Sequence, residues 1–279
     1  MEASAFFQKI GAAADADIPL AETALQLSAD DRAGLDIGRY RHHLDDIAKD
    51  VGSRFSALIE AGAADDAATR IAALKHIISD QYKYEGDHDD FHDLKNADLA
   101  QVIDRKKGLP ITLSIIAIQA AREQNWQLEG VNFPGHFLLR MTHEGERLIA
   151  DPFENFQLLQ APDLRALLKK IAGPDAELSS TYYETATNRD ILVRLQNNIK
   201  FGLISDEEYS AALKISKRLL LIAPGEHRLL FDSAVLEART GHISDAIRLL
   251  EQYLKSAPVN ADRYDAQMFL ASLRDGQKS

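Results

Sequence analysis

The chain has 279 residues, of which 46% are hydrophobic and 27% charged, with a formal net charge of −11 and no cysteine. This composition is typical of a soluble globular protein, and the length predicts one large domain or two ordinary ones. The lack of cysteine excludes disulfides, thiolate zinc sites and thiol nucleophiles. The acidic charge disfavours a nucleic acid partner, because phosphate binding needs a basic face.

Neither a signal peptide nor a membrane span is expected from the hydropathy pattern. The first residues contain no basic segment followed by a long apolar run. No stretch of about 18 uninterrupted apolar residues occurs. We therefore expect a cytoplasmic protein without a membrane partner.

The first 80 residues contain apolar side chains at helical spacing in three segments. The first segment opens at Pro19, the second follows a cap at Asp30 or Asp31, and the third runs from about residue 64 to 79. Further along, Asn96 is expected to cap a short helix, since asparagine is a favoured N-cap residue.

The segment 84–93 is rich in aspartate and histidine and is too polar for the core. His88 and His92 are four residues apart, which would place both on one side of a helix and suggests a metal site. However, no His-Glu-x-x-His pattern is present, and the aspartate spacing differs from an EF-hand loop. A solvated loop with a helix cap is therefore the favoured interpretation, and no metal or cofactor is expected.

The middle of the chain changes from helical to strand-like periodicity. Pro110 suits the first position of a helix over 111–123 that is apolar almost all round, which predicts a buried central helix. A strand-like pattern follows over 128–141, and it returns after a turn at Glu144-Gly145 over 147–151, with another short run at 156–159. Helices followed by a small antiparallel sheet predict an α+β domain.

The C-terminal part is helical from about Asn188 and contains a repeat of 34 residues. Three pairs of positions recur at this offset: Ala212 and Ala246, Leu220 and Leu254, and Ala223-Pro224 and Ala257-Pro258. This period, with a proline closing each helix pair, resembles the tetratricopeptide repeat. About two repeats and a terminal helix from Ala261 to Leu273 are predicted, so we expect one domain over residues 1–185 and a second over 186–279.

His136 and Asp151 are the best candidates for site chemistry. If Glu144-Gly145 forms a two-residue turn, His136 lies opposite Phe153, and Asp151 is its diagonal neighbour on the same face, about 7–8 Å away at the backbone. A carboxylate beside an imidazole fixes its tautomer and raises its basicity, which is the base-and-orienter half of a triad. The alternative is a histidine–aspartate hydrogen bond that only stabilises the sheet.

Four segments carry a resemblance to a known family: Asn96–Leu99, Arg105–Ser114, Val131–Arg140 and Asp151–Phe153. They resemble the SirB-type transglutaminase-like proteins, which join a transglutaminase-like core to C-terminal tetratricopeptide repeats. The resemblance implies an α+β, papain-like core with a helical N-terminal region and a small antiparallel sheet, followed by an all-α array. It also implies that the helix after Gly108 corresponds to the helix whose start carries the catalytic cysteine in true transglutaminases. By the same resemblance, His136 and Asp151 match the other two members of the triad.

The position of that cysteine falls near Pro110, judged by the distance back from Asn125, where the helix ends. Proline has no nucleophilic group, so Thr112 and Ser114 are the nearest hydroxyls. A hydroxyl has a far higher pKa than a thiol and needs closer assistance from a base. Both hydroxyls also have a structural interpretation: Ser114 can bond a carbonyl one turn back, and Thr112 can help satisfy backbone groups of the first turn.

Three functions are compatible with these features. The favoured one is a non-catalytic, transglutaminase-like protein, a pseudoenzyme that acts as a protein-binding or regulatory module through its repeats. The alternative is a hydrolase or acyltransferase with Ser114 or Thr112 as nucleophile, His136 as base and Asp151 orienting it. In the third, His136 and Asp151 are retained for fold stability alone.

Overall fold

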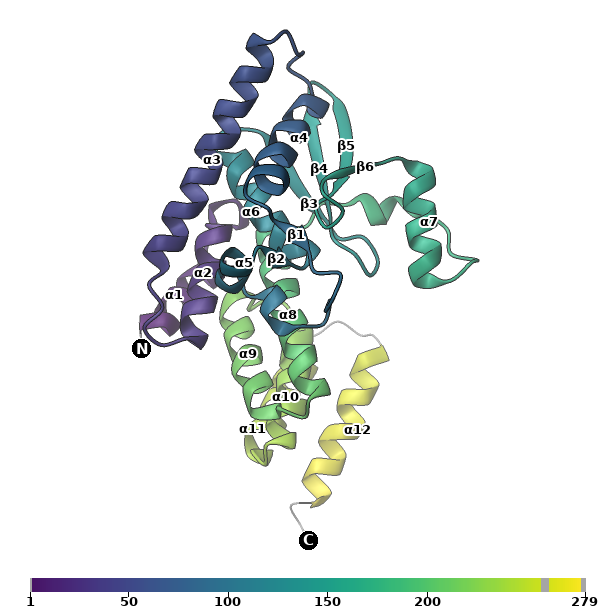
Figure 1. The fold of residues 1–279 in the computed structure, drawn as a ribbon. Coiled ribbons are helices and arrows are strands. Elements are labelled where there is room, and N and C mark those ends of the chain that lie inside the picture. The colour runs from purple at the N-terminus through teal and green to yellow at the C-terminus, as the bar shows by residue number, and fades with distance from the viewer. Residues whose placement is uncertain (1, 257–260, 277–279) are drawn as a thin grey trace. The chain divides into compact units, whose positions relative to one another are not determined.

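The structure is a computed structural model of the chain, and it describes residues 2–256 and 261–276 (Figure 1). The chain forms two compact units. One is the continuous segment Asp15–Leu195, and the other consists of two segments, Met1–Ala14 and Gln196–Ser279. The domain boundary between residues 185 and 186 stays a prediction. Within the described residues, no helix combines the length and apolar character that crossing a membrane requires.

The unit Asp15–Leu195 contains helices, two short parallel strands and a four-stranded antiparallel sheet, which is the predicted α+β class. Its elements are η1 (Asp15–Asp17), α2 (Leu20–Asp31), α3 (Ile37–Glu60), α4 (Ala67–Lys75), η2 (His76–Gln81), β1 (Glu85–Gly86), η3 (Leu94–Ala97), α5 (Leu99–Arg105), β2 (Lys107–Gly108), α6 (Pro110–Glu123), β3 (Gln127–Val131), β4 (Leu138–His143), β5 (Glu146–Asp151), β6 (Gln157–Leu159), α7 (Ala161–Ala172), η4 (Ser180–Tyr183) and the first part of α8 (Asn188–Ser205).

Two predicted helix caps are wrong. Asp30 and Asp31 lie in the last turn of α2, and α3 is capped instead by Asp36, whose carboxylate accepts a hydrogen bond from the Gly38 amide at 2.8 Å. Asn96 lies within η3, and the cap of α5 is Asp98, which accepts from the Gln101 amide at 3.1 Å. In both places several polar residues precede the helix, and the sequence alone does not say where the backbone becomes extended.

Helix α6 is the buried central helix that the apolar pattern predicts. It begins with Pro110 at its first position after the extended Leu109, and eleven of its residues are buried. It packs against α3 on one side and against β3 and β4 on another (Figure 1). A helix covered on several sides by other elements has no polar face to give to solvent, which explains its nearly uniform apolar character.

The sheet has the order β3-β4-β5-β6, with every neighbouring pair antiparallel. Glu144 and Gly145 form the predicted two-residue turn with φ angles of 46° and 85°, and Leu139 pairs with Ala150 as expected. The continuous strand predicted over 128–141 is wrong, because residues 132–137 form a turn between β3 and β4. The parallel pair β1-β2 was not predicted, since two residues are too few for a periodic pattern.

The second unit is all helical. Its elements are α1 (Glu2–Ala12), the part of α8 from Gln196 onward, α9 (Tyr209–Ile222), α10 (Arg228–Arg239), α11 (Ile243–Ser256) and α12 (Ala261–Gly276). Helix α1 packs against α9, where Gly11 allows a close approach because a Cβ there would collide with the carbonyl oxygen of Leu221.

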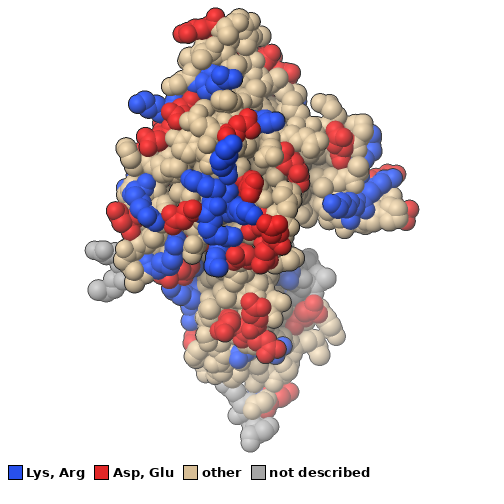
Figure 2. Space-filling view, viewed as in Figure 1, with Lys and Arg blue, Asp and Glu red and all other residues tan. Residues whose placement is uncertain are grey.

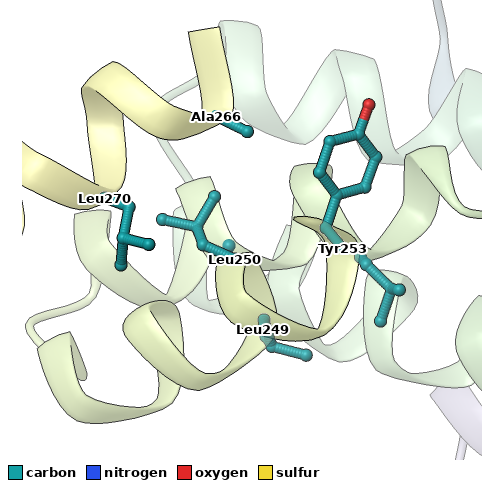
Figure 3. Close-up of a cluster of buried hydrophobic side chains, with 7 residues drawn as sticks. Leu249, Leu250, Tyr253, Ala266 and Leu270 are labelled. Carbon is teal, nitrogen blue, oxygen red and sulfur yellow. The ribbon is translucent and has the colours of Figure 1, made fainter. Parts of the chain in front are cut away.

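The repeat pattern has a packing basis in this unit. Ala212 and Ala246 are fully buried, as expected of small residues that let paired helices approach closely. Leu220 and Leu254 both pack against one apolar cluster, whose members include Leu249, Leu250, Tyr253, Ala266 and Leu270 (Figure 3). Ala223 follows the end of α9, whereas its predicted counterpart Ala257-Pro258 lies outside the described residues. The predicted two helix pairs followed by a terminal helix match α8 to α12.

Candidate functional site

The predicted contact between His136 and Asp151 is present. Nε2 of His136 lies 2.8 Å from Oδ2 of Asp151, and Oδ1 of the same carboxylate accepts a hydrogen bond from the Phe153 amide at 2.9 Å. The two side chains are only 12% and 6% exposed. Both carboxylate oxygens therefore have a donor, which holds the imidazole in one orientation and in the tautomer that carries its proton on Nε2.

His136 is held by the turn between β3 and β4. Its amide donates to the Phe133 carbonyl at 3.1 Å, and Gly135 has a φ of 64°, in the left-handed region that favours glycine. Arg194 of α8 clamps this turn from the other side: Nη2 donates to the His136 carbonyl at 2.7 Å and Nη1 to Oδ1 of Asn132 at 3.0 Å. The position of the imidazole thus depends on a residue 58 positions further along the chain.

An aromatic contact joins this pair to the loop that precedes α5. The Phe153 ring lies edge-on to the His136 ring, with 6.3 Å between centroids, and it also contacts His88 at 4.5 Å and Phe91 at 5.7 Å. Gly86 allows this approach, because a Cβ there would lie 2.5 Å from the Phe153 ring. The loop therefore covers one side of the aromatic ring that flanks the imidazole.

The same loop is tied to α5 by a buried carboxylate, so the predicted solvated loop is wrong in part. Asp87 is only 2% exposed, and its Oδ2 accepts from Nη2 of Arg105 at 3.1 Å. Although burial opposes the charged form, hydrogen bonds from Asp90 and Asn96 and the charges of Lys107 and Arg105 lower the pKa of Asp87. Within residues 2–256 and 261–276, no group of three or more histidine, aspartate or glutamate side chains is arranged to hold a metal ion.

Thr112 and Ser114, the candidate nucleophiles, are fully buried and donate to backbone carbonyls. Oγ1 of Thr112 lies 2.7 Å from the Asn96 carbonyl oxygen, and Oγ of Ser114 lies 2.8 Å from that of Pro110, one turn back. The Ser114 bond is the back-bonding expected of serine inside a helix. Each hydroxyl proton is therefore directed at a carbonyl oxygen.

The chemistry open to the pair follows from these contacts. With Nε2 bonded to Asp151, the imidazole has Nδ1 left to accept or donate a proton, and the described part of the chain gives Nδ1 no hydrogen-bond partner. Pro110, at the position that the resemblance assigns to the cysteine, begins α6 and is buried. The pair of His136 and Asp151 is therefore assembled without an adjacent thiol.

The helical unit contains a second candidate site, which we call the α10 groove. It consists of two cavities of about 400 and 210 Å³ that share Val235 and Arg239 of α10. The first cavity is also lined by Phe231 and Phe269, and the second by Phe201, Ile204 and Tyr209. Phe201 is 58% exposed, so an aromatic side chain at this groove faces solvent. Sequence reasoning missed these residues, because exposed apolar side chains on a repeat follow the same helical period as buried ones.

Comparison with known proteins matches both units to families. The Transglutaminase-like superfamily matches residues 38–197, and a tetratricopeptide repeat family matches residues 199–271. A protein of Xylella fastidiosa, named UPF0162 protein, is 30% identical over 247 residues, covering 88% of this chain and 86% of its own length.

Two further relatives cover less of the chain. Protein SirB1 of Salmonella typhimurium is 26% identical over 161 residues, which is 57% of this chain and 60% of its own length. Human F-box only protein 21 is 37% identical over 82 residues, covering 29% of this chain and 13% of its own length. No solved structure matches the chain significantly.

Proposed function

Because this chain belongs to the transglutaminase-like superfamily and yet contains no cysteine, we propose that it is a non-catalytic member that binds a protein partner through its tetratricopeptide-like helices. The observation that carries the proposal is the α10 groove, in which α8, α9, α10 and α12 contribute aromatic and aliphatic side chains. The proposal includes a cytoplasmic location, and the transglutaminase-like unit acts as a folded shell without acyl transfer.

The chemistry of the α10 groove supports a peptide segment as the occupant. Phe201 and Val235 offer apolar contacts, and no ion pair of Arg239 is found among the described residues. Asp232, which lines the same cavity, is already bonded to Lys200 at 2.7 Å. A short segment with an apolar side chain and a carboxylate would meet both features, since aromatic residues and arginine supply most of the binding free energy at protein interfaces. Tetratricopeptide arrays present such surfaces to extended segments of other proteins.

The environment of the candidate nucleophiles supports the lack of catalysis. Thr112 and Ser114 are buried and donate to carbonyl oxygens, so neither presents its proton to His136. A hydroxyl nucleophile needs a hydrogen bond to its base, because the neutral hydroxyl reacts slowly. His136 and Asp151 are then a pair that stabilises the turn before β4.

The test is recovery of a binding partner and its loss in groove variants. Full-length protein is used to capture partners from an extract of the source cells, and each partner is then purified and titrated against wild type, Phe201→Ala and Arg239→Glu. We expect both substitutions to weaken binding about tenfold or more, as at other interface residues of these types. Ile59→Ala, at an apolar side chain that is 37% exposed in the other unit, is the control and should bind as wild type does.

Two outcomes would reject the proposal. One is that no partner is recovered even at high input. The other is that every recovered partner binds Phe201→Ala and Arg239→Glu as tightly as wild type, which would place the contact away from the α10 groove.

The hydrolase or acyltransferase alternative is favoured by one observation, the 2.8 Å contact between His136 and Asp151. In that case Ser114 or Thr112 must leave its carbonyl acceptor and turn toward the imidazole. A serine-reactive phosphonate probe distinguishes the two functions: labelling that disappears in His136→Ala supports an enzyme. No labelling, or labelling that His136→Ala leaves unchanged, removes this alternative.

A further inference from the structure

Three polar side chains away from His136 form a closed triangle. Nζ of Lys106 lies 3.0 Å from Nε2 of His43 and 3.0 Å from the hydroxyl oxygen of Tyr84, and these two atoms are 2.8 Å apart. His43 comes from α3, Tyr84 precedes β1 and Lys106 follows α5. The triangle is partly sheltered: Tyr84 is only 1% exposed, and the other two residues are half-buried.

The backbone of Lys106 has the left-handed conformation, with φ of 63° and ψ of 12°. Its amide donates to the Val102 carbonyl at 2.8 Å and so closes the end of α5. Glycine is the least strained residue at such a helix end. A lysine therefore stands at a position where backbone geometry alone favours glycine.

Lys106 also lacks the usual partner of a lysine. Within the described parts of the chain no carboxylate lies within ion-pair distance of its amine, because the nearby Asp104 is bonded to Arg39 and to the Tyr40 hydroxyl. The adjacent Lys107 is different, with Oδ2 of Asp89 at 2.7 Å. Two consecutive lysines thus have opposite electrostatic surroundings.

Of the remaining groups around the triangle, some favour and others disfavour the protonated forms of Lys106 and His43. The rings of Tyr84 and Tyr82 lie 4.3 and 6.0 Å from the Lys106 amine, and both favour a cation. Asp46 and Asp104 raise the pKa of His43, but burial and the Lys106 charge outweigh them and lower it. Burial likewise lowers the pKa of Lys106 against the attraction of Asp104.

The triangle can accommodate a neutral amine. A neutral Lys106 donates one N–H to the Tyr84 hydroxyl oxygen, and the Tyr84 proton is directed at Nε2 of His43, so within the triangle the lone pair of the amine accepts no hydrogen bond. Tyr84 keeps its proton under these conditions, because burial raises the pKa of its hydroxyl. Protonating both His43 and Lys106 would place two cations 3.0 Å apart. The arrangement therefore increases the uncharged, nucleophilic fraction of the amine and sets a base beside it.

The surface around the triangle favours an anionic reactant. Figure 2 shows lysines and arginines gathered on the face that carries α5 and β2 in Figure 1, with aspartates and glutamates beside them. On a chain of net charge −11, a local gathering of cations favours the approach of a small anion.

We propose that Lys106 is an acyl acceptor, modified by small acyl phosphates, with His43 as the base. The amine attacks the acyl carbon, the new N–C bond forms, and the C–O bond to phosphate breaks. Phosphate leaves with the electron pair, and the proton lost by the amine passes to Nε2 of His43 and then to solvent. The product is an amide, without charge, in place of the half-buried amine.

The experiment uses full-length protein and acetyl phosphate at about pH 7.5, where most lysines are protonated. Remaining amines are capped after denaturation with a heavy acetyl label, and site-resolved mass spectrometry gives the initial rate at each lysine. We expect Lys106 to react on the order of tenfold faster than Lys107, because Nε2 of His43 can take the proton of its amine whereas the Lys107 amine is paired with Asp89. A Lys106 rate equal to or below that of Lys107 would overturn the proposal.

Two further measurements link the rate to the triangle. In His43→Gln the amide oxygen can accept from an ammonium group but cannot take a proton, so the rate at Lys106 should fall to that of Lys107. His42→Gln, at the exposed neighbour, should leave it unchanged. Denaturing wild type in urea should remove the difference between the two lysines. If Lys106 still reacts faster than Lys107 in urea, the difference comes from local sequence and the site is rejected. The site is also rejected if Lys106 still reacts faster in His43→Gln while the rates at the other lysines are unaltered.

Discussion

Nη2 of Arg194 donates to the His136 carbonyl at 2.7 Å, and the same guanidinium bonds Asn132, so one side chain of α8 closes the turn that carries the imidazole. Burial lowers the pKa of Arg194, because desolvation disfavours its charged form. The hydrogen bonds that the guanidinium donates offset this cost. The turn between β3 and β4 is therefore stabilised from outside the sheet.

Replacing Arg194 with alanine should loosen this turn. We expect a loss of about 1–3 kcal/mol in the free energy of unfolding, because the His136 carbonyl loses a charged donor. Backbone amides of residues 132–137, Pro134 excepted, should exchange hydrogen faster, measured by mass spectrometry. Arg165→Ala, at an exposed residue of α7, serves as the control. Unchanged exchange in Arg194→Ala would show that the turn holds without the clamp.

The pair of His136 and Asp151 should show a measurable coupling in stability. We expect His136→Ala to lower the free energy of unfolding by about 1–3 kcal/mol, because Asp151 is left as a buried carboxylate with one oxygen unpaired. In the double variant with Asp151→Ala, the total loss should be smaller than the sum of the two single losses. Urea unfolding of the four proteins measures this cycle. Additive losses would mean that the 2.8 Å contact contributes nothing to stability.

Gly86 is predicted to be intolerant of a side chain. Alanine there would place its Cβ 2.5 Å from the Phe153 ring, and we expect a destabilisation of about 1–3 kcal/mol from overpacking. Combining Gly86→Ala with Phe153→Leu should recover part of the loss, since the smaller side chain makes room. Gly225→Ala, where a Cβ meets open space, is the matched control in thermal unfolding. A Gly86→Ala protein as stable as the control would contradict the close approach.

The stability of the Asp15–Leu195 unit should depend on pH through His43. Burial and the charge of Lys106 lower its pKa in the folded state, so below about 6.5 the unfolded chain binds a proton that the folded chain does not. Stability is therefore full above that pH and falls as the pH decreases toward the folded pKa.

Urea unfolding at about pH 7.5 and 5.5 tests this dependence. The loss between the two pH values should be smaller in His43→Gln than in wild type, because glutamine does not titrate. His42→Gln should keep the wild-type loss, since this side chain is 80% exposed. An identical loss in all three proteins would assign the pH dependence to other groups.

The local sequence pattern was sufficient to predict those elements whose packing or pairing partners lie close in the chain. The apolar run after Pro110 predicted α6, and the two-residue turn at Glu144-Gly145 predicted the register that brings His136 and Asp151 into contact. The cap at Asp36 and the break between β3 and β4 were missed, because both depend on where the backbone leaves one conformation for another. That choice is decided by packing against distant elements.

The sequence by itself determined that thiol chemistry is absent, that a buried helix is followed by an antiparallel sheet, and that a 34-residue helical repeat closes the chain. Composition and periodicity express these properties directly. Only the tertiary structure decided that Asp87 is buried against Arg105, that Arg194 clamps the His136 turn, and that Lys106 meets His43 and Tyr84. These contacts join residues 18 to 63 positions apart, and no local pattern encodes them, because long-range contacts arise from the packing of whole elements.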